Sequence, residues 1–263
     1  MDLPFDPNLA LGPLRISWHS LFSLIGMGVG SWVSFRLARR LVKDERIYPF
    51  AIAVVVGGLV AARIGHIADN WPYYGAHPDQ LAAFWNGGAA VAAAPIGSAI
   101  GGWIAARRLR LPVGFMFDIT VIGIVLGEAI GRIGDIVNGE HHAIACSGLP
   151  WCVRYTDPAS YGQRAFVHPV VAYDLLVDLV IFAVLLRYFA RVTGHPPEGR
   201  VFWLYCVLYG GFRFATSFLR LDPVVLAGLQ EAQLLGLGYV LAGVPVLVWA
   251  HRRDRGRMRS AGP

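Results

Sequence analysis

A decapeptide near the middle of the chain, Gly-Arg-Ile-Gly-Asp-Ile-Val-Asn-Gly-Glu at 131–140, holds the residue types most able to do chemistry. It ends an apolar run, 121–130, that is typical of a membrane helix. Charged groups at that depth cost a few kcal/mol and are therefore usually functional. Arg132 suits a phosphate, because its planar guanidinium donates to two oxygens and keeps its charge. The alternative is a buried structural ion pair between Arg132 and Glu128, which lie four residues apart on one helix face.

Glycines leave one face of this predicted helix almost bare. Gly127, Gly131 and Gly134 have no side chain to keep a neighbour away, so the face admits another backbone or a lipid headgroup. Asp135 lies three residues after Arg132 and shares its face. We therefore expect a phosphate site formed by Arg132 with Gly131, Gly134, Asp135 and Asn138.

The composition indicates a membrane protein. The chain has 263 residues, of which 56% are hydrophobic and 15% charged, and its mean hydropathy is +0.51. A soluble domain of this length carries more charge. The net charge of +6 would suggest a nucleic-acid partner in a soluble protein, but here the position of the charges explains it better and predicts no nucleic acid. The acidic start, 1–8, has no basic segment, so no cleaved signal peptide is expected.

Apolar runs predict the fold class. A membrane helix needs roughly 20 apolar residues, and seven stretches meet that requirement. They predict an all-α polytopic membrane protein with about seven transmembrane helices in a single domain, 1–263. The predicted helices are about 16–37, 49–67, 89–106, 115–136, 170–189, 201–219 and 229–250.

The basic residues predict the orientation. Most of the 23 lysines and arginines follow the first, third and fifth predicted helices or lie in the tail, 251–263. Cytoplasmic segments carry such an excess, so the amino terminus is expected outside and the carboxyl terminus inside. The outer segments, about 68–88 and 139–169, are long enough to cover a site, although a plain surface loop explains them too.

Three arginines remain inside predicted helices. Arg63, Arg132 and Arg213 each lie near the outer end of a separate helix, and few acids are available to them. A shared anion explains three such cations economically, and a phospholipid phosphate is the anion present at that depth. Three unrelated structural ion pairs are the alternative. A solute transporter fits less well, because transport sites lie near the midplane.

Two of the three cysteines, Cys146 and Cys152, share the second outer segment. A disulfide between them suits an external compartment, but the spacing alone does not decide whether their Cα atoms are close enough. Two cysteines are too few for a structural zinc site without histidine partners. We predict neither a metal nor another cofactor.

Taken in order, several segments resemble the bacterial prolipoprotein diacylglyceryl transferase family. The decapeptide at 131–140 resembles the signature of that family. Further matches are 62–65, 70–74, 85–88, 149–153, 168–174 and 212–214. Members of the family take phosphatidylglycerol from the outer leaflet and transfer its diacylglyceryl group to the lipobox cysteine of a preprolipoprotein, releasing glycerol phosphate.

The resemblance implies a location, partners and residue roles. It implies a multi-pass enzyme of the bacterial cytoplasmic (inner) membrane whose active site faces the outer leaflet. Its partners would be phosphatidylglycerol, the preprolipoprotein signal peptide and membrane lipids. Arg132 and Arg213 match family arginines tied to lipid binding and catalysis, and Glu140 matches the closing acid of the signature. Arg63 would support the phosphate site.

The chain departs from the family pattern at polar positions. Ala92-Ala93-Ala94 stands where the family usually has His-Gly-Gly, and Ser217 replaces a glutamate. Asp135 replaces an asparagine, and His19 replaces a tyrosine. His19 is therefore a candidate base, because imidazole suits deprotonation of a thiol near neutral pH. The structural alternative is that His19 is a helix-end histidine whose ring bonds a backbone carbonyl and takes no part in chemistry.

These departures leave two hypotheses open. Either the chemistry is redistributed over other residues, among which His141, His142 and His168 are further candidate bases, or the chain is a diverged paralogue. Such a paralogue would bind phospholipid or hold a membrane partner without catalysis.

Overall fold

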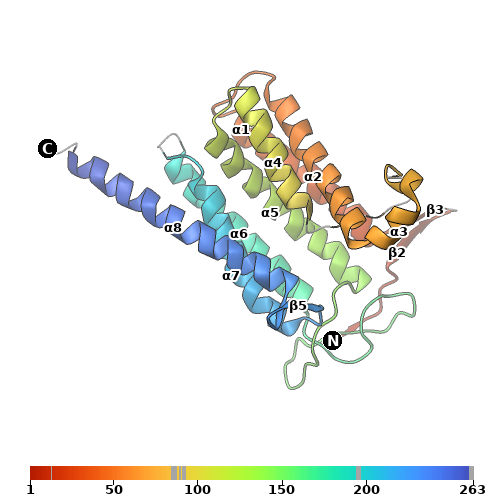
Figure 1. The fold of residues 1–263 in the computed structure, drawn as a ribbon. Helices are drawn as coiled ribbons and strands as arrows, with labels where there is room; N and C mark the ends of the chain where they lie inside the picture. Colours follow the sequence, from red (N-terminus) through yellow and green to blue (C-terminus); the bar gives the residue numbers. More distant parts are fainter. Residues whose placement is uncertain (13, 84–87, 89, 91–92, 194–196, 261–263) are drawn as a thin grey trace. The chain divides into compact units, whose positions relative to one another are not determined.

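The computed structural model describes residues 1–12, 14–83, 88, 90, 93–193 and 197–260, and they are mostly helical (Figure 1). The chain forms two compact units, one of Leu37–Phe117 and the other of Met1–Arg36 with Asp118–Pro263. The prediction of a single domain stays a prediction.

The Leu37–Phe117 unit is built on two helices that pack through small residues. Its elements are α2 (Ile47–Asp69), α3 (Trp71–Ala76), the 3-10 helix η1 (Pro78–Gln80) and α4 (Ala93–Arg108). A Cβ atom added to Gly57 of α2 would lie 2.4 Å from the carbonyl oxygen of Gly97 in α4. Side chains larger than hydrogen would force these helices apart, so the glycines permit the close backbone contact.

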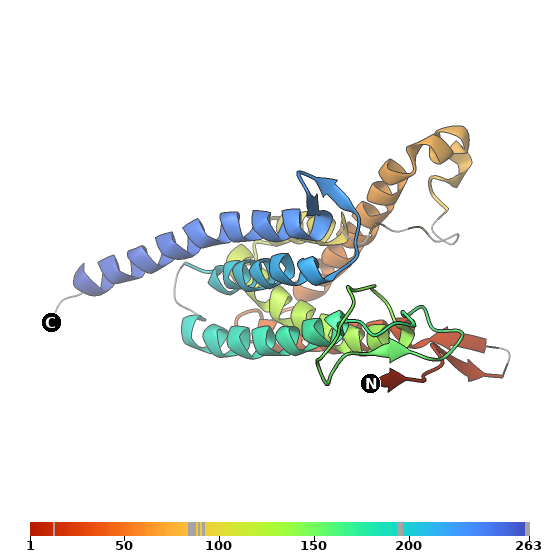
Figure 2. The same cartoon turned by 90° about the horizontal axis from the view of Figure 1, so that it is seen from below.

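The other unit holds the long helices that carry the chemistry. They are α1 (Trp18–Ala38), α5 (Val113–Asn138, which begins in the first unit), α6 (Val170–Val192), α7 (Arg200–Thr216) and α8 (Glu231–Ser260). Gly26 of α1 faces Gly127 of α5, where an added Cβ would lie 2.2 Å from a carbonyl oxygen. Helices α6, α7 and α8 lie side by side (Figure 1 and Figure 2). Gly210 of α7 and Gly236 of α8 make the same kind of contact as Gly26 and Gly127.

Short strands occur at the ends of the helices, which the prediction of an all-α fold did not include. They form three two-stranded sheets: β1 (Asp2–Leu3) with β4 (Arg154–Tyr155), β2 (Asn8–Leu11) with β3 (Leu14–Ser17), and β5 (Val224–Leu226) with β6 (Leu229–Gln230). The predicted first helix began near residue 16, but α1 begins at Trp18. The reason is that Leu14–Ser17 pairs with Asn8–Leu11 as an antiparallel hairpin.

The segment between α5 and α6 is folded onto the helices. Ala143 and Val167 pack with Val170 and Val171 of α6 in a small apolar core. The disulfide left open by the sequence is confirmed, since Cys146 and Cys152 are bonded with their Cα atoms 5.7 Å apart. The segment 139–169 therefore folds over the end of α5, where the hydroxyl of Tyr155 donates to the carbonyl of Ile136 and the backbone N–H of Tyr161 to that of Asn138.

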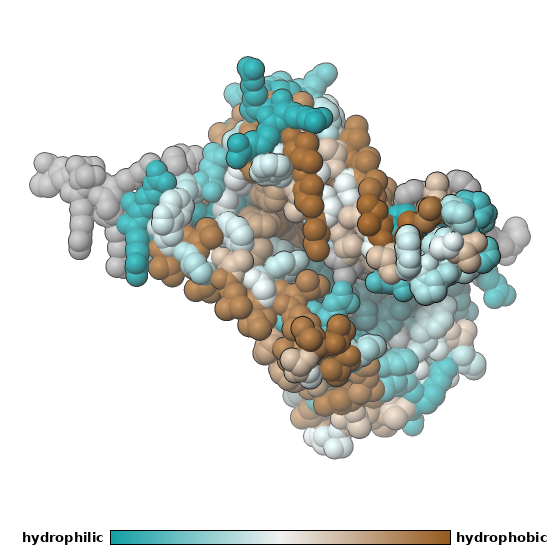
Figure 3. Space-filling model, in the orientation of Figure 1, coloured by the Kyte–Doolittle hydropathy of each residue, from teal (hydrophilic) through white to brown (hydrophobic). Residues whose placement is uncertain are grey.

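Each predicted membrane helix overlaps a helix of the structure, although residues 16–17 and 229–230 lie in strands, but only some of the helices have the length and apolarity of a span. Four do: α1, α2, α5 and Glu231–Arg253 of α8. Helices α4 and α7 have 16 and 17 residues, fewer than the roughly 20 a span requires. Figure 3 shows apolar side chains over much of the helical surface, as expected for helices that face lipid. The fold is thus that of a membrane protein.

Asp118 caps α7 from a neighbouring helix. Its side chain is buried, Oδ2 accepts from the N–H of Gly199 at 2.9 Å and Oδ1 from that of Phe202 at 2.8 Å. Gly199 is the N-cap residue and has no side chain with which to cap the helix itself. We expect Asp118→Ala to lower the free energy of unfolding by about 2 kcal/mol, measured by thermal unfolding in detergent. Asp118→Asn keeps one acceptor oxygen and should lose less, whereas an equal loss would contradict the capping role.

Candidate active site

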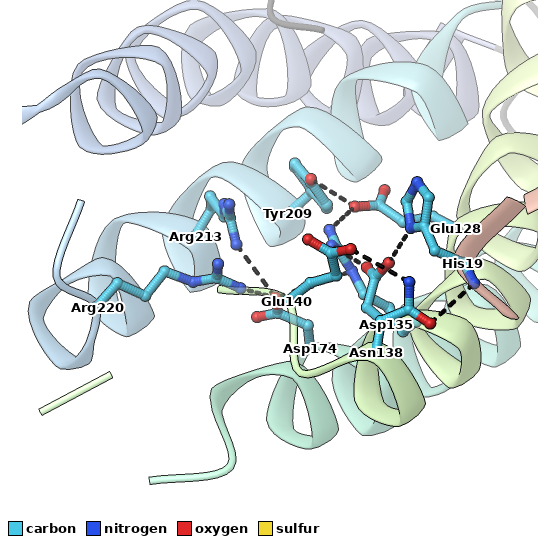
Figure 4. A network of polar contacts seen from close by, with 10 residues as sticks. His19, Glu128, Asp135, Asn138, Glu140, Asp174, Tyr209, Arg213 and Arg220 are labelled. Atoms are coloured by element: carbon cyan, nitrogen blue, oxygen red, sulfur yellow. Dashed lines mark hydrogen bonds and ion pairs between the residues drawn. The ribbon is translucent and has the colours of Figure 1, made fainter. Parts of the chain in front are cut away.

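A network of polar and charged side chains, buried or partly buried except for His19, lies where α5, α6 and α7 come together (Figure 4). All of its members belong to the Met1–Arg36 and Asp118–Pro263 unit. They are His19 from α1, Glu128, Arg132, Asp135 and Asn138 from α5, Glu140 just after it, Asp174 from α6, Tyr209 and Arg213 from α7, and Arg220 after the 3-10 helix η3 (Ser217–Leu219).

Arg132 is held by two carboxylates of its own helix. Its Nη2 donates to Oε1 of Glu128 at 2.5 Å, and its Nη1 donates to Oδ2 of Asp135 at 3.0 Å. The Tyr209 hydroxyl also donates to Oε1 of Glu128, at 2.9 Å. The Glu128–Arg132 pair considered from the sequence is therefore present, as the i,i+4 spacing allows.

Asp135 joins this pair to α1. Its Oδ1 lies 2.5 Å from Nδ1 of His19, and the side chain of Asp135 is 6% exposed while that of His19 is 48% exposed. Nδ1 of His19 thus contacts a carboxylate, whereas the structural alternative expected the ring to bond a backbone carbonyl. The Oδ1 atom of Asn138 accepts from the backbone N–H of His19 at 3.4 Å, which ties the first turn of α1 to α5.

Gly134 makes this approach of α1 sterically feasible. An added Cβ would lie 2.5 Å from the carbonyl oxygen of Trp18 and 2.8 Å from Cα of His19. A real side chain would push the first turn of α1 away and separate His19 from Asp135. The bare face of α5 thus receives a backbone here, and a phosphate-lining role for Gly131 and Gly134 stays a prediction.

Arg213 and Arg220 converge on Asp174 (Figure 4). The Nη1 atom of Arg213 donates to Oδ2 of Asp174 at 3.2 Å, and Nη2 of Arg220 donates to the same oxygen. Ser217, which stands where the family has a glutamate, is buried and donates instead to the carbonyl of Arg213 at 2.8 Å. The carboxylate partner of Arg213 therefore comes from α6. Arg220 and Asp174 were not predicted as site residues, because a loop arginine and a helix-start acid give no local sign of meeting.

Arg63 belongs to the other unit and bonds carbonyls there. It is 4% exposed and donates to the carbonyl oxygens of Gln80 at 2.6 Å, Leu81 at 3.1 Å and Gly88 at 3.2 Å. Its guanidinium carbon also lies 5.2 Å from the ring centroid of Tyr74. These contacts hold the segment after η1 against α2, and a share for Arg63 in the phosphate site stays a prediction.

A cavity of about 260 Å³ lies beside Glu140, between the end of α5 and the start of α6. Its walls are mainly apolar and include Val153 and Val171. The hydroxyl of Tyr155, another wall residue, donates to the Ile136 carbonyl at 2.8 Å, and burial raises the pKa of Tyr155 to about 12. The cavity therefore places a neutral, mostly apolar surface next to the acid that closes the signature.

His141 also lines this cavity but is a weak base. Desolvation of the ring, together with the charges of Arg220 and Arg132, lowers the pKa of His141 to about 4, even though the residue as a whole is exposed. Its ring is therefore neutral at pH 7 and binds a proton poorly. Among the described residues, no three His, Cys, Asp or Glu side chains are grouped as metal ligands would be.

Two predicted features fall wholly or partly outside the described residues. Trp85, Asn86 and Gly87 of the predicted turn are not described, nor is Ala92 at the position of the family's histidine.

The fold and the network together define a helical membrane protein with buried arginines and carboxylates gathered at the carboxyl end of α5. Comparison with known proteins shows which family of membrane proteins the chain resembles. The family model for prolipoprotein diacylglyceryl transferase matches residues 8–249. Proteins named phosphatidylglycerol–prolipoprotein diacylglyceryl transferase are similar over nearly the whole chain. One from Dehalococcoides mccartyi is 31% identical over 97% of both chains, and one from Gloeobacter violaceus is 32% identical over 93% of this chain and 92% of its own.

This chain belongs to the prolipoprotein diacylglyceryl transferase family. It is accordingly a transferase of lipoprotein biosynthesis, and the family resemblance of its motifs is confirmed.

Proposed function

We propose that this chain transfers the diacylglyceryl group of phosphatidylglycerol to the lipobox cysteine thiol of a preprolipoprotein. The observation that carries the proposal is the network around Arg132 and Arg213, within a chain that aligns with such enzymes over almost its full length. A sulfur–carbon bond forms at the glyceryl carbon and the carbon–oxygen bond to the phosphate breaks. Glycerol phosphate leaves with both electrons of that bond, and the thiol proton must be accepted.

The membrane arrangement belongs to the same proposal. Helices α1, α2 and α4–α8 cross the bacterial cytoplasmic membrane, with the amino terminus outside and the basic tail inside. The excess of lysine and arginine on alternate connections supports this orientation. The carboxyl end of α5 then faces the outer leaflet, where phosphatidylglycerol can enter from the side.

Arg132 and Arg213 hold the phosphate in this proposal. Their guanidiniums stabilise the negative charge that grows on the leaving phosphate, and donors positioned in advance in this way often contribute more to catalysis than any other single effect. Glu140 stands beside the cavity and orients the acceptor or accepts a proton. Asp135 and Asn138 keep Arg132 and the first turn of α1 in place.

His19 is the base in this proposal, and Asp135 positions it. The carboxylate of Asp135 favours the tautomer with the proton on Nδ1, so Nε2 of the half-exposed ring is left to take the thiol proton. A carboxylate orients a catalytic histidine in the same way in serine hydrolases. His19 and Asp135 both depart from the family pattern, and they contact each other. This contact supports two substitutions that compensate for each other and keep the activity, rather than a loss of activity.

A direct assay tests the proposal. Purified protein is incubated with phosphatidylglycerol and a lipobox peptide, and the peptide is examined for the mass gain of one diacylglyceryl group. Wild-type protein should produce this gain. Its absence, under conditions where another family member is active, would contradict the proposal.

A second candidate, phospholipid binding without catalysis, is favoured by one observation. Ser217 stands where the family has a glutamate, and its hydroxyl donates to the carbonyl of Arg213, so the acid of that position is missing. A non-catalytic protein would retain bound lipid through purification, give no mass gain and show no effect of Arg213→Ala on any transfer.

A further inference from the structure

Asp174 is the point at which three arginines meet. Besides its bonds to Arg213 and Arg220, its Oδ2 lies 3.9 Å from Nε of Arg132. Arg132 also has Glu128 and Asp135 as partners. Over the described part of the chain, Arg213 and Arg220 have only this one carboxylate as an ion-pair partner. Two arginines therefore share one carboxylate oxygen, while Oδ1 of Asp174 and Oδ2 of the neighbouring Asp178 are buried without a hydrogen-bond partner among the described residues.

Several buried donors around this carboxylate have no acceptor. The Nε and Nη1 atoms of Arg220 and the Nε of Arg132 are buried and without a hydrogen-bond partner among the described residues. The Arg220 side chain is 0% exposed. Folded proteins rarely leave such groups unpaired, so each calls for an explanation such as a bound ion. Guanidinium donors without acceptors call for an anion in particular.

Two buried glutamines follow along the chain, Gln230 in β6 and Gln233 in the first turn of α8, and Oε1 of Gln230 is an acceptor without a donor among the described residues. Gln230 donates from Nε2 to the carbonyl of Arg220 at 3.1 Å, and the backbone N–H of Gln230 donates to Oε1 of Gln233 at 3.0 Å. The Nε2 atom of Gln233 is a further buried donor without an acceptor among the described residues, and the residue is 2% exposed. The backbone of Arg220 is thus linked through Gln230 to Gln233, whose Nε2 atom has no acceptor among the described residues.

We infer that Asp174 occupies the place of a phosphate in the empty protein, and that Arg220 is a third arginine of the phosphate site. When the Asp174 carboxylate moves aside, a phosphate there meets Nε of Arg132, Nη1 of Arg213 and the guanidinium of Arg220. The closed packing fits this exchange, because the internal carboxylate fills the space that the ligand would need. The inference rests on the proposed function and adds Arg220 as a ligand and Asp174 as an internal competitor.

A phosphate suits the site better than another carboxylate. Arginine forks pair with two oxygens of a phosphate, and a phosphate offers more acceptor oxygens than the side chain it displaces. Two ligands can supply such a phosphate: the lipid headgroup as a phosphodiester and the released glycerol phosphate as a phosphomonoester.

Binding measurements on the full chain in detergent test the inference without an acceptor peptide. The probes are phosphatidylglycerol in mixed micelles and soluble glycerol phosphate, with diacylglycerol as the phosphate-free control. Arg220→Gln should weaken binding about tenfold to hundredfold, through loss of charge-assisted hydrogen bonds. Asp174→Asn should instead tighten binding severalfold, because the competing charge is gone. Arg15→Gln, the same change at an exposed arginine of this unit, should leave binding unchanged.

Arg220→Gln and Asp174→Asn are expected to change binding in opposite directions, so a general loss of folding cannot explain both results. If Arg220→Gln folds poorly, Arg220→Lys keeps the charge, loses the fork and should still bind severalfold more weakly. Unchanged binding by either Arg220 variant, or weaker binding by Asp174→Asn, would overturn the inference. Binding of the lipid alone would support a site for the substrate headgroup, and binding of both probes a site that also holds the product. Normal transfer with unchanged binding refutes only this inference, whereas the expected binding changes without transfer refute only the proposed function.

Discussion

Replacing Arg132 with glutamine is expected to reduce diacylglyceryl transfer about a thousandfold and to destabilise the protein at the same time. Loss of one donor to a developing oxyanion typically costs 10²–10³ in rate, roughly, and the guanidinium offers more than one donor. The substitution also leaves Glu128 and Asp135 without the cation between them. Breaking a buried ion pair on one side costs about 4 kcal/mol. Initial transfer rates and thermal unfolding in detergent measure the two effects separately.

A charge-balanced variant separates the chemical role of Arg132 from its structural role. Glu128→Gln combined with Arg132→Gln removes both members of the closest pair, so we expect the melting temperature to recover partly. Transfer should stay low, because no guanidinium remains at this position to hold the phosphate. If the double variant regains activity, Arg132 serves only to neutralise its helix neighbours and the proposed phosphate contact is wrong.

The helices could be predicted from sequence, because a membrane helix depends on a local run of apolar residues. The pairing of β1 with β4 could not, because it joins distant segments. Asp2 pairs with Arg154 in parallel, and no pattern of two or three residues indicates a partner so far along the chain. The start of α1 was misplaced for a local reason: Leu14–Ser17 continues the apolar run of the helix but pairs with the preceding strand, and this hairpin decides where the helix begins.

The candidate site shows the same division between local and distant contacts. The contacts of Arg132 with Glu128 and Asp135 follow from i,i+4 and i,i+3 spacing on one helix. The contact of Asp174 with Arg220 joins α6 to a loop 46 residues later, and it depends on how helices pack. Sequence comparison marked His19 and Asp135 as two separate departures from the family. Only their positions in space show them as one pair.

Replacing His19 with phenylalanine is expected to slow transfer by roughly 10²–10⁴-fold, the usual contribution of a general base. Initial transfer rates with phosphatidylglycerol and a lipobox peptide measure this effect. His251→Phe, at an exposed histidine of α8, should keep the rate of the wild type. A wild-type rate in His19→Phe would assign the base to another residue.

The contact between His19 and Asp135 allows a second test in the same assay, of whether the two residues act together. If Asp135 acts through the imidazole, Asp135→Asn should slow wild-type transfer more than it slows transfer in the His19→Phe background. Groups that act as one unit are strongly non-additive in this way. Asp135 also bonds Arg132 at 3.0 Å, so part of its effect should persist without His19. The size of that persisting part measures how far Asp135 serves the phosphate arginine. Full additivity of the two substitutions would therefore leave His19 and Asp135 as neighbours without a shared catalytic role.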